Sequence, residues 1–366
     1  MKIGLITFHY NHNFGASLQC YALQKVLKEL GHNVDIIDYL PRDGERLPFW
    51  RGWQIRSGSF RKRAKQRMLQ LLHERAASRA FIKFKERHWN QSPPCSSLAS
   101  FRELASGYDA LICGSDQVWV FERPSPYFLD TGSDYAGLRI SYAACCGHDR
   151  QKGELEDTIS SFLKGFDSIS VRNEFSKKII GEIVEKEITV VADPTVLTTF
   201  EEIECEYRLH FDEYILLYCL SEDDLDRQLN IIEKIKEEIG NFPVVSVVAN
   251  SCPRKNPFAD IHIYDAHPGQ WVWLIANAQF VYTDSFHGVL LCCKYRKNFT
   301  ADYKEKWRSL RLLDIAKRYG IGDRIHYSEK MMSLRLSTSE VEYSTVHASM
   351  QRHKEESIEF LKQALG

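Results

Sequence analysis

The stretch Gln279–Leu291, which reads QFVYTDSFHGVLL, decides how the chain is expected to fold. Its first part, Phe280–Thr283, is a short apolar and β-branched run that predicts a buried strand. Asp284 and Ser285 carry side chains that cap the N-terminus of a helix, and the apolar run Val289–Cys293 predicts that this helix is buried. The stretch is therefore interpreted as a strand, a tight polar turn and the start of a helix.

His287 lies at the start of the predicted helix. Free backbone N–H groups and the positive end of the helix dipole gather at such a place. This environment suits an anion held beside a titratable imidazole. A capped turn with one histidine packed on it would have the same sequence, so the rest of the chain has to decide between binding and packing.

The length, composition and charge of the chain narrow the kinds of protein that it can be. The chain has 366 residues, of which 44% are hydrophobic and 27% charged, and these values are typical of a globular protein with two domains. The net charge of −1 argues against nucleic acid or any other general polyanion as a partner. The N-terminal residues run directly into a predicted strand without a signal peptide, and no window holds the roughly 18 consecutive apolar residues of a membrane-spanning helix. We therefore expect a cytoplasmic protein.

The ten cysteines do not suggest a metal or redox site. None of them has the C-x-x-C spacing of zinc ligands or of a redox pair. Cys145–Cys146 and Cys292–Cys293 are adjacent pairs inside apolar runs, where cysteines act as small core residues. The sequence therefore predicts no metal, no cofactor and a reducing compartment.

Strands and helices alternate from the start of the chain. Lys2–Phe8 is a predicted strand, Asn11–Ala16 a turn, Ser17–Leu30 a helix and Asn33–Tyr39 a second strand. The turn lacks the G-x-G-x-x-G pattern of a dinucleotide site. Further strands are predicted near residues 108–113, 139–144, 168–171 and 188–191.

Polar residues follow several of these strands. The carboxyl ends of parallel strands share one edge of a sheet, and ligands bind beyond that edge. The residues expected to gather there are Asn13, Ser115, His148 and Arg172.

A second alternation begins after a polar, aperiodic stretch. We predict two Rossmann-like α/β domains, residues 1–197 and 213–336, joined by a linker at 198–212 and separated by a cleft. Residues 337–366 are mostly helical in pattern and are expected to pack back on the first domain.

The first domain contains a basic helical insertion at residues 42–90. Between residues 51 and 90 there are 12 Lys and Arg against 2 Glu, and Phe49, Trp50 and Trp53 stand near its front. One interpretation is a solvated helical insertion. The other is a surface, 51–90, that meets anionic lipid headgroups or a lipid-diphosphate substrate and holds the protein peripherally at the inner face of the membrane.

Short motifs across the whole chain resemble, as a set and in order, the polysaccharide pyruvyl transferase family. They cover nearly all of the chain outside the basic insertion. The motifs are N-x-N-F-G-A-S-L-Q-x-Y-A-L-Q (11–24), G-S-D-Q-V-W (114–119), S-Y-A-A (141–144), S-V-R (170–172), D-P-T (193–195), T-D-S-F-H-G (283–288) and R-x-L-R-L-L with G-I-G-D-R (308–324).

The resemblance implies a GT-B-like pair of Rossmann-like domains. It also implies transfer of the pyruvate unit of phosphoenolpyruvate to hydroxyls of a sugar, as a ketal, in a cell-surface glycan or its lipid-linked precursor. The family's catalytic Arg and His map onto Arg172 and His287. Two positions depart from the family pattern: Asn173 stands where an acidic residue is usual, and Cys145–Cys146 replaces a small–aromatic pair after S-Y-A-A.

The chemistry of the donor fits these residues. Phosphoenolpyruvate carries a phosphate and a carboxylate, so its site needs a bidentate cation and backbone donors, which Arg172 and the helix start at 286–289 would supply. His287 is the candidate for proton transfer, with Asp284 expected to orient it and Tyr142 or His148 as a second proton carrier. The residues expected to contact substrate are Asn13, Gly15, Ala16, Ser115, Asp116, Tyr142, His148, Ser285, Phe286 and Gly288.

Other residues and other functions compete with this assignment. Asp193–Thr195 is expected to be a structural turn, and His9, His12 and His267 to be surface or loop histidines. A GT-B nucleotide-sugar glycosyltransferase remains the alternative function, although no acidic residue for base and ribose binding is identified in the second domain. A non-catalytic relative would tolerate loss of Arg172 and His287, and both are present.

Overall fold

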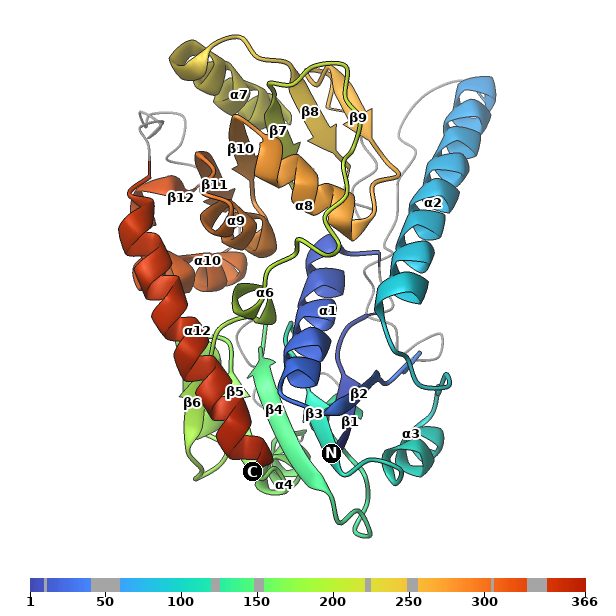
Figure 1. Cartoon of the computed structure of the whole chain (residues 1–366). Helices are drawn as coiled ribbons and strands as arrows, with labels where there is room; N and C mark the ends of the chain where they lie inside the picture. Colours follow the sequence, from blue (N-terminus) through green and yellow to red (C-terminus); the bar gives the residue numbers. More distant parts are fainter. Residues whose placement is uncertain are drawn as a thin grey trace.

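Two parallel six-stranded sheets form the framework of the chain (Figure 1). The computed structural model describes residues 1–9, 12–40, 60–119, 126–147, 155–220, 225–248, 256–303, 306–327 and 341–366, with the backbone alone at 60–71, 155–158 and 306–309. In the first sheet the order is β2-β1-β3-β4-β5-β6, and in the second it is β12-β11-β10-β7-β8-β9.

The strands are short and mostly apolar. Those of the first sheet are β1 (Lys2–Ile6), β2 (Asn33–Ile36), β3 (Ala110–Cys113), β4 (Leu138–Ala144), β5 (Ser168–Val171) and β6 (Ile188–Val190). Those of the second are β7 (Ile215–Tyr218), β8 (Val244–Val247), β9 (Ile261–Ile263), β10 (Phe280–Thr283), β11 (Phe299–Tyr303) and β12 (Ile325–Tyr327). Central strands such as β7 and β10 are buried at every position, as parallel strands covered on both faces require.

Helices connect the strands and cover the sheets. Those of the first half are α1 (Phe14–Glu29), α2 (Phe60–His88), α3 (Leu98–Ala105), α4 (Leu155–Lys164), α5 (Glu174–Gly181) and the short α6 (Pro194–Leu197). Those of the second half are α7 (Leu225–Ile239), α8 (Pro268–Asn277), α9 (Phe286–Lys294), α10 (Lys306–Tyr319) and α12 (Tyr343–Leu365). Single 3-10 turns occur at Pro126–Phe128 and Gly322–Arg324.

The two halves meet through α1 and α6 of the first half and α8 and α9 of the second (Figure 1). Phe14 begins α1 and stacks on Trp271 of α8, with ring centroids 5.2 Å apart. Lys294 of α9 donates to the carbonyl of Thr198 just after α6, at 2.8 Å. Because buried apolar residues of both halves join in one cluster, the junction is packed like the interior of a domain.

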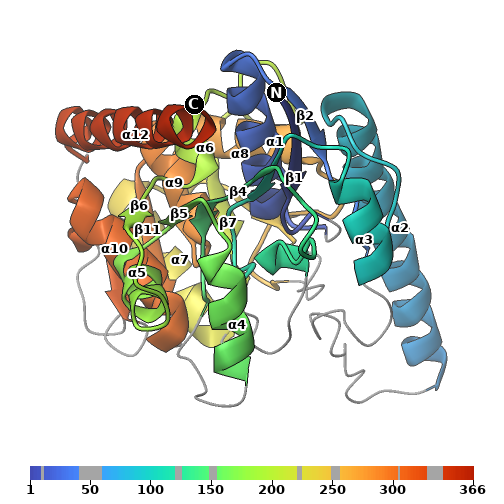
Figure 2. The same cartoon turned by 90° about the horizontal axis from the view of Figure 1, so that it is seen from below.

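The last helix, α12, crosses from the second half to the first and runs beside α6 and β4 (Figure 1). It is anchored there by a buried hydrogen bond, in which Ser357 Oγ accepts from the backbone N–H of Ala192 at 2.8 Å. Figure 2 shows α12 on the side of the molecule opposite to α2 and α3.

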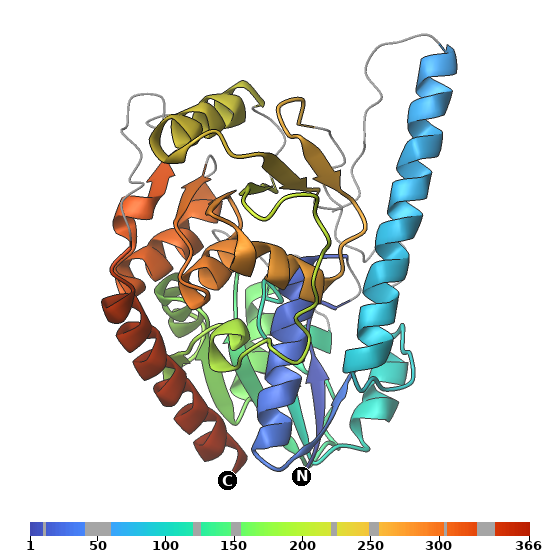
Figure 3. The ribbon, with the colours of Figure 1, turned by 45° about the horizontal axis from the view of Figure 1, so that its top comes forward.

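The basic insertion contributes the 29-residue helix α2, whose C-terminal half packs one face on the body and leaves the other exposed. Phe81 and Phe84 are buried, and Phe81 lies 5.0 Å from Phe14 between ring centroids. His73 stacks at 3.9 Å on Tyr264, which follows β9 in the second half. The helix therefore contacts both halves, while its N-terminal part extends away from the body (Figure 3).

Two features bear on a membrane role: the aromatic residues at the front of the insertion and the presence or absence of a membrane-spanning helix. Phe49, Trp50 and Trp53 lie outside the described residues. Among the helices that the structure does describe, none combines the length and the apolar character needed to span a bilayer.

Candidate functional site

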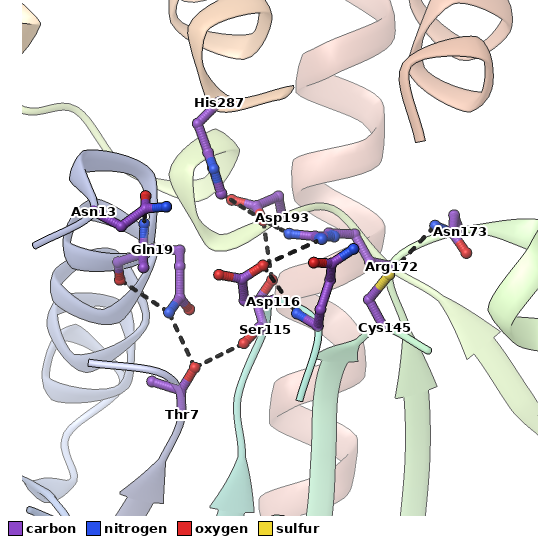
Figure 4. A network of polar contacts seen from close by, with 12 residues as sticks. Thr7, Asn13, Gln19, Ser115, Asp116, Cys145, Arg172, Asn173, Asp193 and His287 are labelled. Atoms are coloured by element: carbon purple, nitrogen blue, oxygen red, sulfur yellow. Dashed lines mark hydrogen bonds and ion pairs between the residues drawn. The ribbon is translucent and has the colours of Figure 1, made fainter. Parts of the chain in front are cut away.

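The candidate site lies where the carboxyl ends of β3, β5 and β6 face the start of α9 from the second half (Figure 4). Asp193 stands at its centre, directly after β6. Oδ2 of Asp193 is 3.0 Å from Arg172 Nη1, 3.0 Å from Ser115 Oγ and 3.4 Å from His287 Nε2. The site is therefore assembled from both halves of the chain around one carboxylate.

The Asp193 carboxylate is buried and ionised. Burial by itself would raise its pKa, but the nearby His287 and Arg172 and the hydrogen bonds from Thr195 outweigh burial and hold the pKa well below the ordinary value. The Thr195 N–H and hydroxyl both donate to Oδ1, at 3.0 and 2.8 Å. This carboxylate is thus a fixed negative charge that can stabilise a protonated His287.

Arg172 is delivered by the end of β5 and is only 4% exposed. Burial alone would lower its pKa, but Cys145, Asp193 and Asp116 raise it above the ordinary value, so the guanidinium stays charged. Besides the Asp193 contact, Nη2 lies 3.6 Å from Asp116 Oδ1, which is too long for a hydrogen bond. Nε and Nη2 have no hydrogen-bond partner within the described part of the chain, so donors remain for an anion.

The aromatic ring of Phe286 covers the guanidinium of Arg172. The distance from Cζ to the ring centroid is 4.5 Å, and Arg311 of α10 lies 5.9 Å from the same ring. A cation held over an aromatic face in a water-poor place is stabilised by the ring quadrupole. Phe286 therefore helps to hold positive charge at the start of α9.

His287 is 7% exposed and packs against the first turn of α1. A Cβ added at Gly15 would stand only 2.0 Å from His287 Nδ1 and 2.4 Å from its Cγ, so only glycine leaves room for the ring. At 3.4 Å from Asp193, Nε2 is within ion-pair range but beyond an ordinary hydrogen bond. It has no hydrogen-bond partner among the described residues.

The start of α9 offers fewer free donors than the sequence suggests. Ser285 caps this helix, because its Oγ accepts from Gly288 N at 3.2 Å and its carbonyl accepts from Val289 N at 3.0 Å. Among the described residues, the N–H groups of Phe286 and His287 are those that remain for a ligand. A Cβ at Gly288 would lie 2.7 Å from Thr283 Oγ1, which explains the glycine.

The loop after β3 carries a strained residue. Asp116 has φ of +81°, a conformation that non-glycine residues seldom adopt. Its carbonyl accepts from Cys145 N at 3.0 Å, and the carbonyl of Ser115 accepts from Thr7 Oγ1 at 2.7 Å. These bonds hold both side chains toward Arg172 and Asp193.

The start of α1 has mainly a structural part. Asn13 Oδ1 accepts from Ala16 N at 3.0 Å and so caps the helix, and Gln19 Nε2 donates to Thr7 Oγ1 at 3.0 Å. Asn13, Gly15 and Ala16 were expected to contact substrate here. Of these, Gly15 is the residue that packs against another site residue, His287.

The two expected second proton carriers are not brought beside His287 by any described contact. Tyr142 is fully buried, and its hydroxyl donates to the carbonyl of Ala192 at 2.9 Å, behind the site. Burial raises the pKa of Tyr142 well above the ordinary value, so a neutral hydroxyl is expected there. His148 lies outside the described residues.

The departures from the family pattern have local structural functions. Asn173 caps α5, since its Oδ1 accepts from Ser176 N at 2.8 Å, and its Nδ2 lies 3.6 Å from Cys145 Sγ. Burial would raise the pKa of the Cys145 thiol, but Arg172 and Arg311 outweigh burial and lower it.

In the described residues no group of three His, Cys, Asp or Glu is arranged to hold a metal ion.

Sequence reasoning missed Asp193 and assigned its task to Asp284. Asp284 Oδ1 instead accepts from Leu220 N at 2.5 Å, and the carboxylate within ion-pair distance of His287 is Asp193. The expectation that Asp193–Thr195 is only a structural turn was incomplete, because the turn also centres the site. Its position at the carboxyl end of β6, on the same edge as Arg172, was the signal available in the sequence.

Two of the histidines set aside as surface or loop residues are structural instead. His9 is buried and contacts Thr7 O and Asp38 Oδ1, each at 2.9 Å. His267 caps α8, because its Nδ1 accepts from Gly269 N at 3.1 Å.

Comparisons with known proteins agree with the fold and with the motifs. A family model described as polysaccharide pyruvyl transferase matches residues 13–301. No curated protein matches the chain.

Similar solved structures are glycosyltransferases and epimerases. They include UGT89C1 of Arabidopsis thaliana complexed with UDP-L-rhamnose, with 11% identity, TM-score 0.54 and coverage of 100% of this chain and 99% of that one. The glycotransferase of kitacinnamycin has 10% identity, TM-score 0.51 and coverage of 100% and 99%. The UDP-GlcNAc 2-epimerase of Methanocaldococcus jannaschii in complex with UDP-GlcNAc and UDP has 14% identity, TM-score 0.50 and coverage of 99% and 100%. The predicted GT-B-like α/β fold is confirmed.

Proposed function

The chain belongs to the polysaccharide pyruvyl transferase family, and on that premise we propose that it uses phosphoenolpyruvate as its donor. The pyruvate unit would be moved onto two hydroxyls of a sugar in a cell-surface polysaccharide or its lipid-linked precursor, with release of phosphate. One observation carries the proposal. A buried Arg172 with unused guanidinium donors stands beside His287, and both share the Asp193 carboxylate.

Arg172 is assigned to hold the donor. Phosphoenolpyruvate has two anionic groups, and a planar guanidinium binds a carboxylate or phosphate through two parallel hydrogen bonds. Since Nε and Nη2 of Arg172 are adjacent donors without hydrogen-bond partners in the described residues, they have the geometry for such a pair. The remaining N–H groups at the start of α9 and the positive end of that helix would bind the second anionic group.

His287 is assigned to move the proton. Protonation of the methylene carbon of phosphoenolpyruvate leaves an oxocarbenium-like centre at C2, which the first sugar hydroxyl attacks. The proton of that hydroxyl restores the imidazolium. Loss of phosphate then lets the second hydroxyl close the ketal, and its proton leaves with the phosphate. Throughout, the Asp193 carboxylate stabilises the protonated ring electrostatically.

Two substitutions test these assignments by their different kinetic effects. Arg172→Lys keeps the charge but loses the planar fork, so KM for phosphoenolpyruvate should rise while kcat changes less. His287→Gln keeps hydrogen bonding but cannot titrate, so kcat should fall by about 10²- to 10⁴-fold with little change in donor affinity. Arg102→Lys and His32→Gln, on remote parts of the first half, serve as matched controls.

Phosphate release from phosphoenolpyruvate in the presence of acceptor is the readout. Near-normal turnover and an unchanged pH profile in His287→Gln would show that the histidine only packs on α1. Equal loss in the Arg102 and His32 controls would show that the assay reports stability and not chemistry.

A nucleotide-sugar glycosyltransferase is the second candidate, favoured by the fold of the nucleotide-sugar enzymes described above. Melting temperature measured with phosphoenolpyruvate and with a panel of nucleotide sugars separates the two, because a ligand stabilises the state that binds it. Stabilisation by phosphoenolpyruvate alone supports the proposal. Stabilisation by a nucleotide sugar alone, or activity that disappears with chelator and returns with Mg²⁺, would favour the glycosyltransferase.

A further inference from the structure

The backbone of Ala192 is held from two directions at the back of the site. Its N–H donates to Ser357 Oγ of α12 at 2.8 Å, and its carbonyl accepts from Tyr142 Oη of β4 at 2.9 Å. Both side chains are fully buried. Two residues far from each other in the sequence therefore fix the two successive peptide planes on either side of the Ala192 Cα, Ser357 the Val191–Ala192 plane and Tyr142 the Ala192–Asp193 plane.

The second of these planes joins Ala192 to Asp193, whose Oδ2 has three neighbouring donors. Arg172 and Ser115 are at hydrogen-bond distance, whereas His287 is 3.4 Å away. A backbone shift of a few tenths of an ångström decides whether the carboxylate forms a hydrogen bond with His287, because such bonds weaken steeply with distance and angle. The position of the Ala192 backbone thus determines whether His287 forms a hydrogen bond with Asp193.

Helix propensity does not explain why position 357 of α12 is a serine. Ser357 Oγ also donates to the carbonyl of His353, one turn earlier, at 2.5 Å. Serine in this arrangement is slightly unfavourable within a helix, and alanine has the higher helix propensity. The contact with Ala192 is the interaction that alanine at this position could not make.

We propose that Ser357 and Tyr142 are positioning residues for the reaction. By holding the Ala192 backbone they fix the position of the Asp193 carboxylate, and the carboxylate in turn fixes the orientation of the His287 ring. The C-terminal helix α12 is then part of the catalytic machinery although none of its described contacts reaches Arg172 or His287. This inference rests on the proposed function for its kinetic test, but not for its spectroscopic test.

The variants are Ser357→Ala, Tyr142→Phe and the double variant, with Thr345→Ala on the exposed side of α12 as the control. Each single variant should lower kcat by about 10-fold, with KM for phosphoenolpyruvate within twofold, because Arg172 keeps its own contacts. The double variant should lose much less than the product of the two single losses, since both residues hold the backbone of the same residue, Ala192. Ser357→Thr, which keeps the hydroxyl, should restore kcat.

A spectrum of protein with ¹⁵N-labelled histidine provides the readout that needs no turnover. The His287 ring signals, assigned by their loss in His287→Gln, should shift in Ser357→Ala and Tyr142→Phe and stay in place in Thr345→Ala. A merely structural role would lower the melting temperature and leave these signals unmoved.

The outcomes separate this inference from the proposed function. Shifted His287 signals in a protein that does not turn over phosphoenolpyruvate would support the positioning role and overturn the donor assignment. An active wild type whose Ser357→Ala variant keeps kcat within twofold and an unshifted His287 signal would overturn the positioning role alone.

Discussion

Gly15→Ala is the substitution with the largest geometric consequence in this site. The added Cβ would stand 2.0 Å from His287 Nδ1, whereas ordinary contacts begin at 3.4 Å. The ring must therefore move by about 1.4 Å along this direction, or the two halves must separate by a similar amount. Either movement disturbs the 3.4 Å contact between Nε2 and Asp193.

The expected effects on stability and on turnover differ in size. Overpacking costs about 1–3 kcal/mol, and alanine in place of glycine returns up to about 1 kcal/mol of helix propensity, so the free energy of unfolding should fall by no more than about 3 kcal/mol. A misplacement of about 1 Å in a catalytic group can cost about 10²-fold in rate. Turnover should therefore fall about 100-fold in a protein that remains folded.

Gly181→Ala is the matched control, because it also adds a methyl group in a helix but meets its nearest neighbour, Ile188 Cδ1, at 3.8 Å. The assay is phosphate release with kcat and KM resolved, together with thermal unfolding of both variants. A Gly15→Ala protein with kcat within twofold of the wild type would refute the reasoning, because the ring would then have room that the structure does not give it.

Three further predictions concern charge. Asp193→Asn leaves the buried Arg172 guanidinium without its counter-charge, so the free energy of unfolding should fall by about 3–5 kcal/mol at neutral pH. Because the pKa of Asp193 is depressed, its contribution to stability is present above about pH 4 and is lost below it, and unfolding curves of the variant should lack this acid-dependent loss. Burial lowers the pKa of His353 to about 4, so between pH 4 and 6.5 the unfolded chain binds more protons than the folded one. The free energy of unfolding should therefore fall as pH drops through this window, by up to about 1.4 kcal/mol per pH unit. The fall should be less steep in His353→Gln. The exposed face of α2 presents basic side chains beside Leu72, which is 52% exposed, and Ile82, which is 50% exposed; we propose that it meets anionic lipid, so sedimentation with anionic vesicles should fade with salt, and equal binding to neutral vesicles would contradict this.

Much of the fold follows from local patterns in the sequence. Short apolar runs such as Phe280–Thr283 bury both faces of a strand, and the four-residue spacing of apolar side chains in α1 builds one packed stripe. Strands that alternate with helices form parallel sheets whose carboxyl ends share an edge. That rule, together with the family motifs, is sufficient to select Arg172 and His287 as candidate site residues.

The contacts between the halves were decided only by the tertiary structure. The pairing of Gly15 with His287, of Asp193 with both His287 and Arg172, and of Ala192 with Ser357 joins positions up to 272 residues apart. Periodicity and capping signals extend over a few turns of chain, so they contain no information on which distant side chains meet. The local sequence around Asp193 is the same whether this residue only caps α6 or also centres a site. Only the packing of α9 and α12 against the turn distinguishes the two roles.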